Sequence, residues 1–172
     1  MTISPSPPSN GCNGYKGVKH MDKDFFVRGI EAHSGMMYRV AYTILRNDDD
    51  CRDALQETAL KAWEKRATLR NEQYFRTWIV RILINTCYDT KRKRRPLVSL
   101  EAIPELSIPP HDPSLAIALQ ALPEKLRLPL MPCYSEGMRY EEIAQSLHLP
   151  KATVRGRIHR AKQQLRKELD AE

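Results

Sequence analysis

The sequence predicts an all-α protein made of two small helical domains joined by a Pro-rich linker, with a helix-turn-helix in the second domain. Three observations predict this fold class. Apolar residues recur at helical spacing through most of residues 24–169. A proline-rich stretch, residues 96–112 (PLVSLEAIPELSIPPHD), separates two such helical regions. Residues 140–169 have the pattern of a short helix, a tight turn with a proline and a second, strongly basic helix.

The composition limits the class of partner. The chain has 172 residues and a formal net charge of +7, which favours an anionic partner. No apolar run is long enough to insert directly into a membrane, and the N-terminus lacks the pattern of a secretory signal, so we expect a cytoplasmic protein that binds nucleic acid. The cysteines at positions 12, 51, 87 and 133 are too scattered for a zinc site or a disulfide framework, and we expect no metal. Small, mostly buried side chains explain them better.

The first predicted domain spans residues 22–95. Residues 1–21 precede it and are rich in Pro, Ser, Gly and Asn, which predicts a disordered N-terminal extension. From 24 to 46 the apolar stripe has a predicted break near Ser34 and Gly35. This break gives two helices, the second N-capped by Ser34.

Four polar residues at 47–50 (NDDD) open the next predicted helix, because acidic side chains suit a helix N-terminus. Capping explains these residues better than metal binding does. The outer face of this helix carries a row of residues at spacings of three and four: Asp53, Gln56, Glu57, Leu60 and Glu64. An acidic face with one apolar residue is either a docking surface for a positively charged protein or an ordinary solvated face.

A loop at 65–73 leads into a long helix predicted over 72–93. Its inner side includes Phe75 and Ile79, whereas Arg76 and Arg81 lie off that stripe. Five basic residues at 91–95 (KRKRR) end it, and their fusion to an amphipathic helix favours contact with phosphates. An aromatic-bearing basic element beside a loop also suits unstacked bases.

The second predicted domain spans residues 113–170. Pro113 and Pro123 each begin a helix. Tyr134 is placed on the inner side of the second of these helices, which is expected to be bent or short because it contains Pro129 and Pro132.

The helix-turn-helix follows Gly137. Each of its helices has one apolar stripe, so the stripes must pack together; their residues are Ile143, Ala144 and Leu147, then Val154, Ile158, Ala161 and Leu165. Pro150 marks the turn. The opposite face of the second helix carries Arg155, Gly156, His159 and Arg160, with further basic residues around them. Such a face suits a DNA major groove and its flanking phosphates.

With these parts in order, the chain resembles the ECF (extracytoplasmic-function) group of the sigma-70 family, which are bacterial RNA polymerase specificity subunits with two helical domains. The resemblance covers about residues 24–169. It rests on DALQETALKAW at 53–63, FRTWIVRILINTCYD at 75–89, LPEKLRLPL at 122–130 and YEEIAQSLHLPKATVRGRIHRAKQQL at 140–165. The order and spacing of these stretches make the combination specific.

The resemblance implies a non-enzymatic transcription initiation factor without a cofactor, and it implies roles for particular residues. The acidic face on 53–64 would bind the clamp helices of the largest subunit of core RNA polymerase. Promoter −10 DNA, with a flipped non-template base, would be engaged by Leu69, Arg70, Asn71, Gln73, Arg76, Arg81 and Asn85. The −35 element would be contacted by Lys151, Thr153, Arg155, Gly156, His159, Arg160 and Lys162. The family also implies an anti-sigma factor as a partner.

The chain departs from the family pattern at a few positions: Ala59 replaces a common Phe, Pro132 is unusual, and His148 replaces the Gly of the turn. Two other functions remain open. A stand-alone helix-turn-helix regulator would bind an operator without polymerase. A DNA-processing enzyme would need converging carboxylates with a metal, or a placed nucleophile, whereas the acids here lie at helix starts or on one exposed face.

Overall fold

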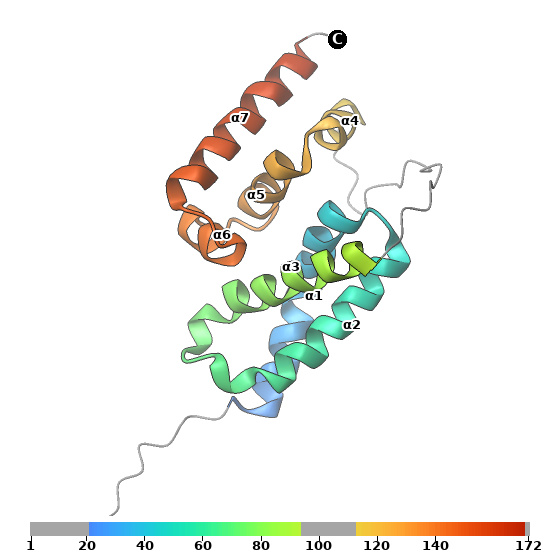
Figure 1. Cartoon of the computed structure of the whole chain (residues 1–172). Coiled ribbons are helices and arrows are strands. Elements are labelled where there is room, and N and C mark those ends of the chain that lie inside the picture. The colour runs from blue at the N-terminus through green and yellow to red at the C-terminus, as the bar shows by residue number, and fades with distance from the viewer. Residues whose placement is uncertain (1–20, 94–112, 171–172) are drawn as a thin grey trace, which may run out of the picture.

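The computed structural model describes residues 21–93 and 113–170, which form seven α-helices and no strand, so the all-α prediction is confirmed (Figure 1). The helices are α1 (Lys23–Leu45), α2 (Asp48–Glu64), α3 (Phe75–Lys93), α4 (Pro113–Ala121), α5 (Glu124–Ser135), α6 (Tyr140–Leu147) and α7 (Lys151–Leu169). Two short 3-10 helices, η1 (Arg66–Thr68) and η2 (Glu72–Tyr74), connect α2 to α3. The predicted linker at 96–112 lies outside the described residues, as does the N-terminal extension apart from Met21, whose side chain is buried.

Residues 21–93, the N-terminal module, form a bundle in which α1, α2 and α3 all pack against one another. Their predicted apolar stripes meet in its centre, where Met37, Ile79 and Leu83 are almost fully buried. Cys51 and Cys87 are free thiols buried in the same core, as expected for small apolar residues. Burial raises the pKa of the Cys87 thiol to about 12, so this sulfur stays protonated and unreactive.

The predicted break at Ser34 and Gly35 is wrong, because α1 runs unbroken from Lys23 to Leu45. The Ser34 hydroxyl donates to the Glu31 carbonyl oxygen at 2.9 Å, so it bonds back into the helix rather than capping a new one. Both residues lie on the exposed face. A glycine there costs about 1 kcal/mol relative to alanine, which the continuous buried stripe on the opposite face offsets.

The start of α2 is as the sequence predicts. Asn47 is the N-cap, and its side-chain oxygen accepts a hydrogen bond from the Asp50 amide at 3.0 Å. Three aspartates, 48–50, occupy the first turn, where their negative charges interact favourably with the positive end of the helix dipole. Capping therefore accounts for this cluster.

Residues 113–170, the C-terminal module, contain α4 to α7. The helix α5 continues for 12 residues through Pro129 and Pro132, so it is not short; both prolines are buried. Tyr134 was predicted on the inner side of α5, and this is wrong because its side chain is 59% exposed. The Lys162 ammonium lies 5.0 Å from the centre of its ring, so a cation on α7 covers the face of the ring instead of apolar side chains.

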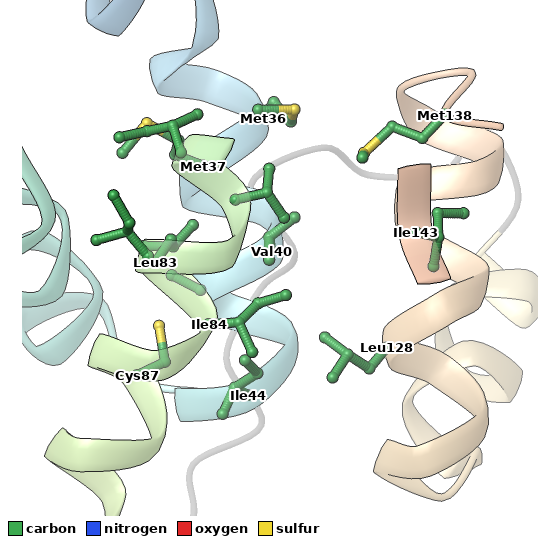
Figure 2. Close-up of a cluster of buried hydrophobic side chains, with 14 of the residues drawn as sticks. Met36, Met37, Val40, Ile44, Leu83, Ile84, Cys87, Leu128, Met138 and Ile143 are labelled. Atoms are coloured by element: carbon green, nitrogen blue, oxygen red, sulfur yellow. The ribbon is translucent and has the colours of Figure 1, made fainter. Parts of the chain in front are cut away.

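The two modules pack against each other and share one hydrophobic core. Figure 2 shows Met36 and Val40 of α1 and Ile84 of α3 opposite Leu128 and Ile143 of the C-terminal module. The largest contacts between the modules are those of α1 with α5 and of α3 with α6. The sequence alone does not predict this packing.

Two glycine positions give a paired stability prediction. A Cβ atom at Gly29 would lie 2.7 Å from Cζ of Phe75, a ring held edge-on by neighbouring aromatic rings, whereas one at Gly156 would meet nothing within 4 Å. We expect Gly29→Ala to destabilise the fold by about 1 kcal/mol, because overpacking exceeds the gain in helix propensity. Gly156→Ala should stabilise it by about 1 kcal/mol. Thermal unfolding checks both, and a lower melting temperature for Gly156→Ala would contradict the open environment.

Candidate nucleic-acid and partner interfaces

The acidic face on α2 is a solvent-exposed surface. All five predicted members are exposed: Asp53, Gln56, Glu57, Leu60 and Glu64. The Leu60 side chain is 63% exposed at the centre of the row, so it is available to pack against another molecule. Glu57 forms an ion pair with Lys61 at 3.2 Å, one helical turn away, and at this exposure the pair contributes little to stability. The face therefore combines an exposed leucine with carboxylates that a cationic partner can reach.

The connection between α2 and α3 is built by local hydrogen bonds. Asn71 is the N-cap of η2, and its side-chain oxygen accepts from the Gln73 amide at 3.0 Å. The Trp78 indole donates to the Thr68 hydroxyl at 3.1 Å, which ties the connection to α3. Leu69 packs against the core. Of the predicted −10 contacts here, Leu69 and Asn71 thus have structural tasks.

The other two predicted contacts in this connection are exposed, and so is an aromatic residue that is not among the predicted contacts. Arg70 and Gln73 face solvent. Tyr74, next to Gln73, has a side chain that is 52% exposed. An exposed aromatic ring beside a basic side chain can stack on an unpaired base. The sequence does contain a signal for the exposure of Tyr74. It is adjacent to Phe75, which lies on the buried stripe, and adjacent residues on a helix point in different directions.

The predicted −10 contacts on α3 do not share one face. Arg81 and Asn85 are exposed and one turn apart. Arg76 lies nine residues before Asn85, which places it about half a turn around the helix, on the side of the C-terminal module. Its guanidinium group binds both carboxylate oxygens of Glu142, at 2.8 and 3.0 Å, and also donates to the Glu136 carbonyl oxygen at 3.3 Å.

The basic end of α3 is partly neutralised. Lys91 forms an ion pair with Glu124 of α5 at 2.5 Å, and Arg92 pairs with Asp89. The Tyr88 hydroxyl donates to Glu124 at 3.0 Å. Burial, together with the negative charge of Glu124, raises the pKa of Tyr88 to about 12. Residues 94 and 95 of the basic block lie outside the described residues.

The helix-turn-helix forms as predicted, and its turn contains His148 at the position where the family usually has glycine. His148 ends α6 in the left-handed conformation, with φ of 53°, where a glycine would be less strained. The Leu149 amide donates to the Ala144 carbonyl oxygen at 3.0 Å, so one of the carbonyl groups in the last turn of α6 has a hydrogen-bond partner. Pro150 is the N-cap of α7. Lys151 of α7 pairs with Glu141 of α6, and this hydrogen bond lowers the pKa of the Glu141 carboxyl.

The outer face of α7 is basic and open. Arg155, His159 and Arg160 are exposed, and Gly156 between them has free space beside its Cα. The buried stripe of Val154, Ile158 and Ala161 fixes the opposite side of the helix. Of the remaining predicted −35 contacts, Lys151 and Lys162 are exposed and Thr153 is half-buried. The structure thus brings the seven predicted residues together on one helix, whose exposed side can enter a groove.

A cavity of about 720 Å³ lies between the modules, walled by α1, α4, α5 and α7. Its apolar and aromatic lining includes Tyr38, Tyr42, Leu115, Leu119, Met131 and Leu165. Cationic side chains also line it, among them Arg46, Lys162 and Arg166. Burial, with the nearby charge of Asp48, raises the pKa of Tyr42 to about 12.

Within residues 21–93 and 113–170, no helix is long and apolar enough to cross a bilayer. The same residues contain no group of three His, Cys, Asp or Glu side chains that could hold a metal ion.

Two family descriptions match the chain: Sigma-70 region 2 matches residues 30–96, and Sigma-70, region 4 matches residues 115–165. The ECF RNA polymerase sigma factor SigE of Mycolicibacterium smegmatis is 35% identical over 80% of this chain, which spans 58% of SigE. SigV of Bacillus subtilis, an RNA polymerase sigma factor, is 31% identical over 90% of this chain and 96% of its own length. SigW of the same organism, an ECF RNA polymerase sigma factor, is 28% identical over 90% of this chain and 94% of its own length.

Two solved structures are similar over most of the chain. One is the sigma factor RpoE of Bartonella quintana in complex with the anti-sigma factor NepR, with a TM-score of 0.68 and 23% identity over 87% of this chain and 97% of that one. The other is CnrH in complex with the cytosolic domain of CnrY, with a TM-score of 0.66 and 26% identity over 88% of this chain and 92% of that one. Both share the helical fold described above.

Proposed function

The chain belongs to the ECF group of the sigma-70 family and is an alternative RNA polymerase sigma factor, and on that premise we propose that three exposed surfaces divide its work. The observation that carries the proposal is their placement: an acidic face on α2 and a basic face on α7, each exposed and each on a separately matched module. One module thus offers a surface for a basic protein and the other a surface for DNA. As an initiation factor, the chain needs no catalytic site of its own.

The acidic face binds core polymerase in this proposal. Asp53, Glu57 and Glu64 attract the basic clamp helices of the largest subunit, while Leu60 supplies apolar contact at the centre of the interface. Charge steers the encounter and fixes the register, and burial of the leucine adds affinity. Gln56 completes the row as a hydrogen-bonding residue.

The promoter is recognised by both modules. Arg70, Gln73, Arg81 and Asn85 are exposed and contact −10 DNA, while the backbone fold held by Leu69 and Asn71 shapes the pocket. Arg76 joins this set once it is released from Glu142. On α7, Arg155 and His159 read base edges of the −35 element. Gly156 lets the backbone come close, and the surrounding contacts to phosphates come from Lys151, Thr153, Arg160 and Lys162.

The domain boundaries and the cellular setting are also part of the proposal. The −10 and core-binding domain spans 22–95, the linker 96–112 and the −35 domain 113–170. The protein acts in the cytoplasm, where polymerase and the chromosome are found. Because one of the two similar solved structures is a sigma factor in complex with the anti-sigma factor NepR, we expect an anti-sigma factor here too.

Transcription with purified components tests the function. We expect the chain, mixed with core polymerase and a promoter library, to yield run-off transcripts whose templates share −10 and −35 sequences. Core polymerase alone is the control. If no transcript appeared and the chain alone bound a palindromic duplex, it would instead be a stand-alone helix-turn-helix regulator. Magnesium-dependent cleavage of the template would point to a DNA-processing enzyme.

A further inference from the structure

The cavity walled by α1, α4, α5 and α7 has an excess of positive charge in its lining. Its basic lining residues are Arg39, Arg46, Arg127, Lys162 and Arg166. Arg39 is neutralised by an ion pair with Glu136, and Asp170 is the one acidic residue of the lining. The remaining cations outnumber this single carboxylate, so the cavity attracts an anion.

Two of these arginines share one carbonyl oxygen at the end of α4. Arg46 of α1 donates to the Gln120 carbonyl oxygen at 2.8 Å, and Arg127 of α5 donates to the same oxygen at 3.0 Å. Arg127 is only 7% exposed and also donates to the Thr43 and Leu122 carbonyl oxygens at 3.0 and 3.1 Å. Two like charges are therefore held close together at the cavity wall.

These two guanidinium groups have no carboxylate partner. Within residues 21–93 and 113–170, no Asp or Glu forms an ion pair with Arg46 or Arg127. The end of a helix carries roughly half a negative charge, which is less than the two positive charges beside it. Among the same residues the Arg46 side chain makes one hydrogen bond, so most of its five N–H donors remain for a ligand. A bound anion would balance the charge that the protein leaves uncompensated.

Tyr42 provides a further unused donor in the lining. Its hydroxyl oxygen is buried and has no hydrogen-bond partner in the part of the chain that the structure describes. The pKa of Tyr42 is about 12, raised mainly by burial, so the hydroxyl stays protonated at neutral pH. A buried hydroxyl without a partner is unfavourable, and an oxygen atom of a ligand would supply the missing acceptor.

The rest of the lining favours a compound that also has an apolar part. Leu119, Met131 and Leu165 line the cavity, and so do the rings of Tyr38 and Tyr42, which stack with 6.0 Å between their centres. An inorganic anion would leave these walls in contact with water, whereas an alkyl chain would cover them. The volume of about 720 Å³ is within the range of about 300–1,000 Å³ that is usual for small-molecule sites.

We propose that this cavity binds a small amphipathic anion, a carboxylate or phosphate group on an alkyl chain, with the anionic group held by Arg46 and Arg127 and the chain packed between Met131 and Leu165. Both oxyanions accept paired hydrogen bonds from a guanidinium group. The site is separate from the acidic face on α2 and from the base-reading residues of α7. The inference therefore goes beyond the proposed function, and its test needs neither polymerase nor DNA.

Calorimetric titration of the full chain with ten-carbon compounds tests the chemistry of the ligand. Decanoate and decyl phosphate carry an anionic group, decanol is uncharged and decyltrimethylammonium is cationic; each is used below its critical micelle concentration. We expect one decanoate or decyl phosphate per chain, bound about 10-fold or more tightly than the uncharged and cationic compounds, because these lack the charge-assisted hydrogen bonds. Octanoate should bind about 10-fold more weakly than decanoate, because it buries two fewer methylene groups. Inorganic phosphate should bind more weakly than decyl phosphate.

Paired variants locate the site. Arg46→Gln should weaken decanoate binding about 10-fold and leave decanol binding unchanged, whereas Arg52→Gln, an exposed position on α2, should change decanoate binding less than about 2-fold. Met131→Trp fills part of the cavity without altering its charge and should weaken binding of both compounds about 10-fold. Its control is Ile117→Trp, at a 66% exposed side chain of α4 outside the lining. Circular dichroism establishes that each variant is folded.

Equal affinities for decanoate and decanol would overturn the inference, because the paired arginines would then contribute nothing. Undiminished decanoate binding to both Arg46→Gln and Met131→Trp would overturn it as well, since the ligand would lie elsewhere on the chain. A chain that directs transcription but binds none of these compounds would overturn this inference and leave the proposed function standing. A chain that binds decanoate as described but directs no transcription would overturn the proposed function alone.

Discussion

Replacing Asp53 and Glu57 together by lysine is expected to weaken binding of the chain to core polymerase by about 100-fold or more. Both side chains are exposed on α2, so the change leaves the core of the N-terminal module intact. In the complex, however, lysines would face the basic clamp helices, and like charges across an interface cost several kcal/mol. The dissociation constant, measured with labelled protein and core polymerase, checks the result. The difference in affinity between the wild type and the variant should be largest at low salt, where charges are least screened.

The matched control is Asp24→Lys with Glu31→Lys on α1. Both of these residues are exposed, and the double change alters the net charge by the same amount. We expect this variant to bind core polymerase as the wild type does. Equal weakening in both variants would mean that net charge, and not the acidic face, controls binding. A melting temperature lowered only in the α2 variant would show damage to the fold instead of to an interface.

Replacing Arg155 by alanine is expected to reduce transcription from the chain's own promoters by about 10- to 100-fold, because one side-chain pair with a base is worth about 1–3 kcal/mol of discrimination. Arg155 is exposed near the start of α7, the part of a recognition helix that contacts base edges. Sequencing transcripts from a library with randomised −35 positions measures the effect. Preference should relax at one or two positions and stay unchanged at the others.

Binding to core polymerase separates this effect from a general defect, since Arg155→Ala should leave it unchanged. The control variant is Lys167→Ala, which removes one exposed positive charge from the last turn of the same helix. It should lower transcription evenly across promoters, if at all. Even loss across all −35 sequences in the Arg155 variant would show that this arginine contacts phosphates and does not select the promoter.

The helices were predictable because each buries one apolar stripe, and burial dominates stability. The Asn47 cap and the turn at Pro150 were predictable because their chemistry is local. The break expected at Ser34 was not found, because local preferences of about 1 kcal/mol are smaller than the gain from a continuous buried face. The sequence pattern describes one helix face at a time, so it could not show that Tyr134 lies beneath a lysine from another helix.

Exposure of the candidate residues on the outer faces of α2 and α7, such as Glu57 and Arg155, was also predictable, because they lie opposite the apolar stripes. Their partners were not. Arg76 and Glu142 are 66 positions apart, and no periodicity connects residues across a linker. Asn71 looked like a group free to bind DNA, but its side chain caps a short helix, a use that depends on the backbone conformation of the loop. Contacts of this kind follow from the tertiary structure and not from the local pattern.

The cavity between the modules has a thermodynamic consequence. Because α1 supplies one wall and α4, α5 and α7 supply the others, the cavity exists only while the modules are in contact. A molecule that fills it binds this form and not the separated one, so mass action stabilises the packed state, by about 2.7 kcal/mol at a concentration 100 times its dissociation constant. Occupancy of the cavity and contact between the modules are therefore positively coupled, whatever the chemical identity of the occupant.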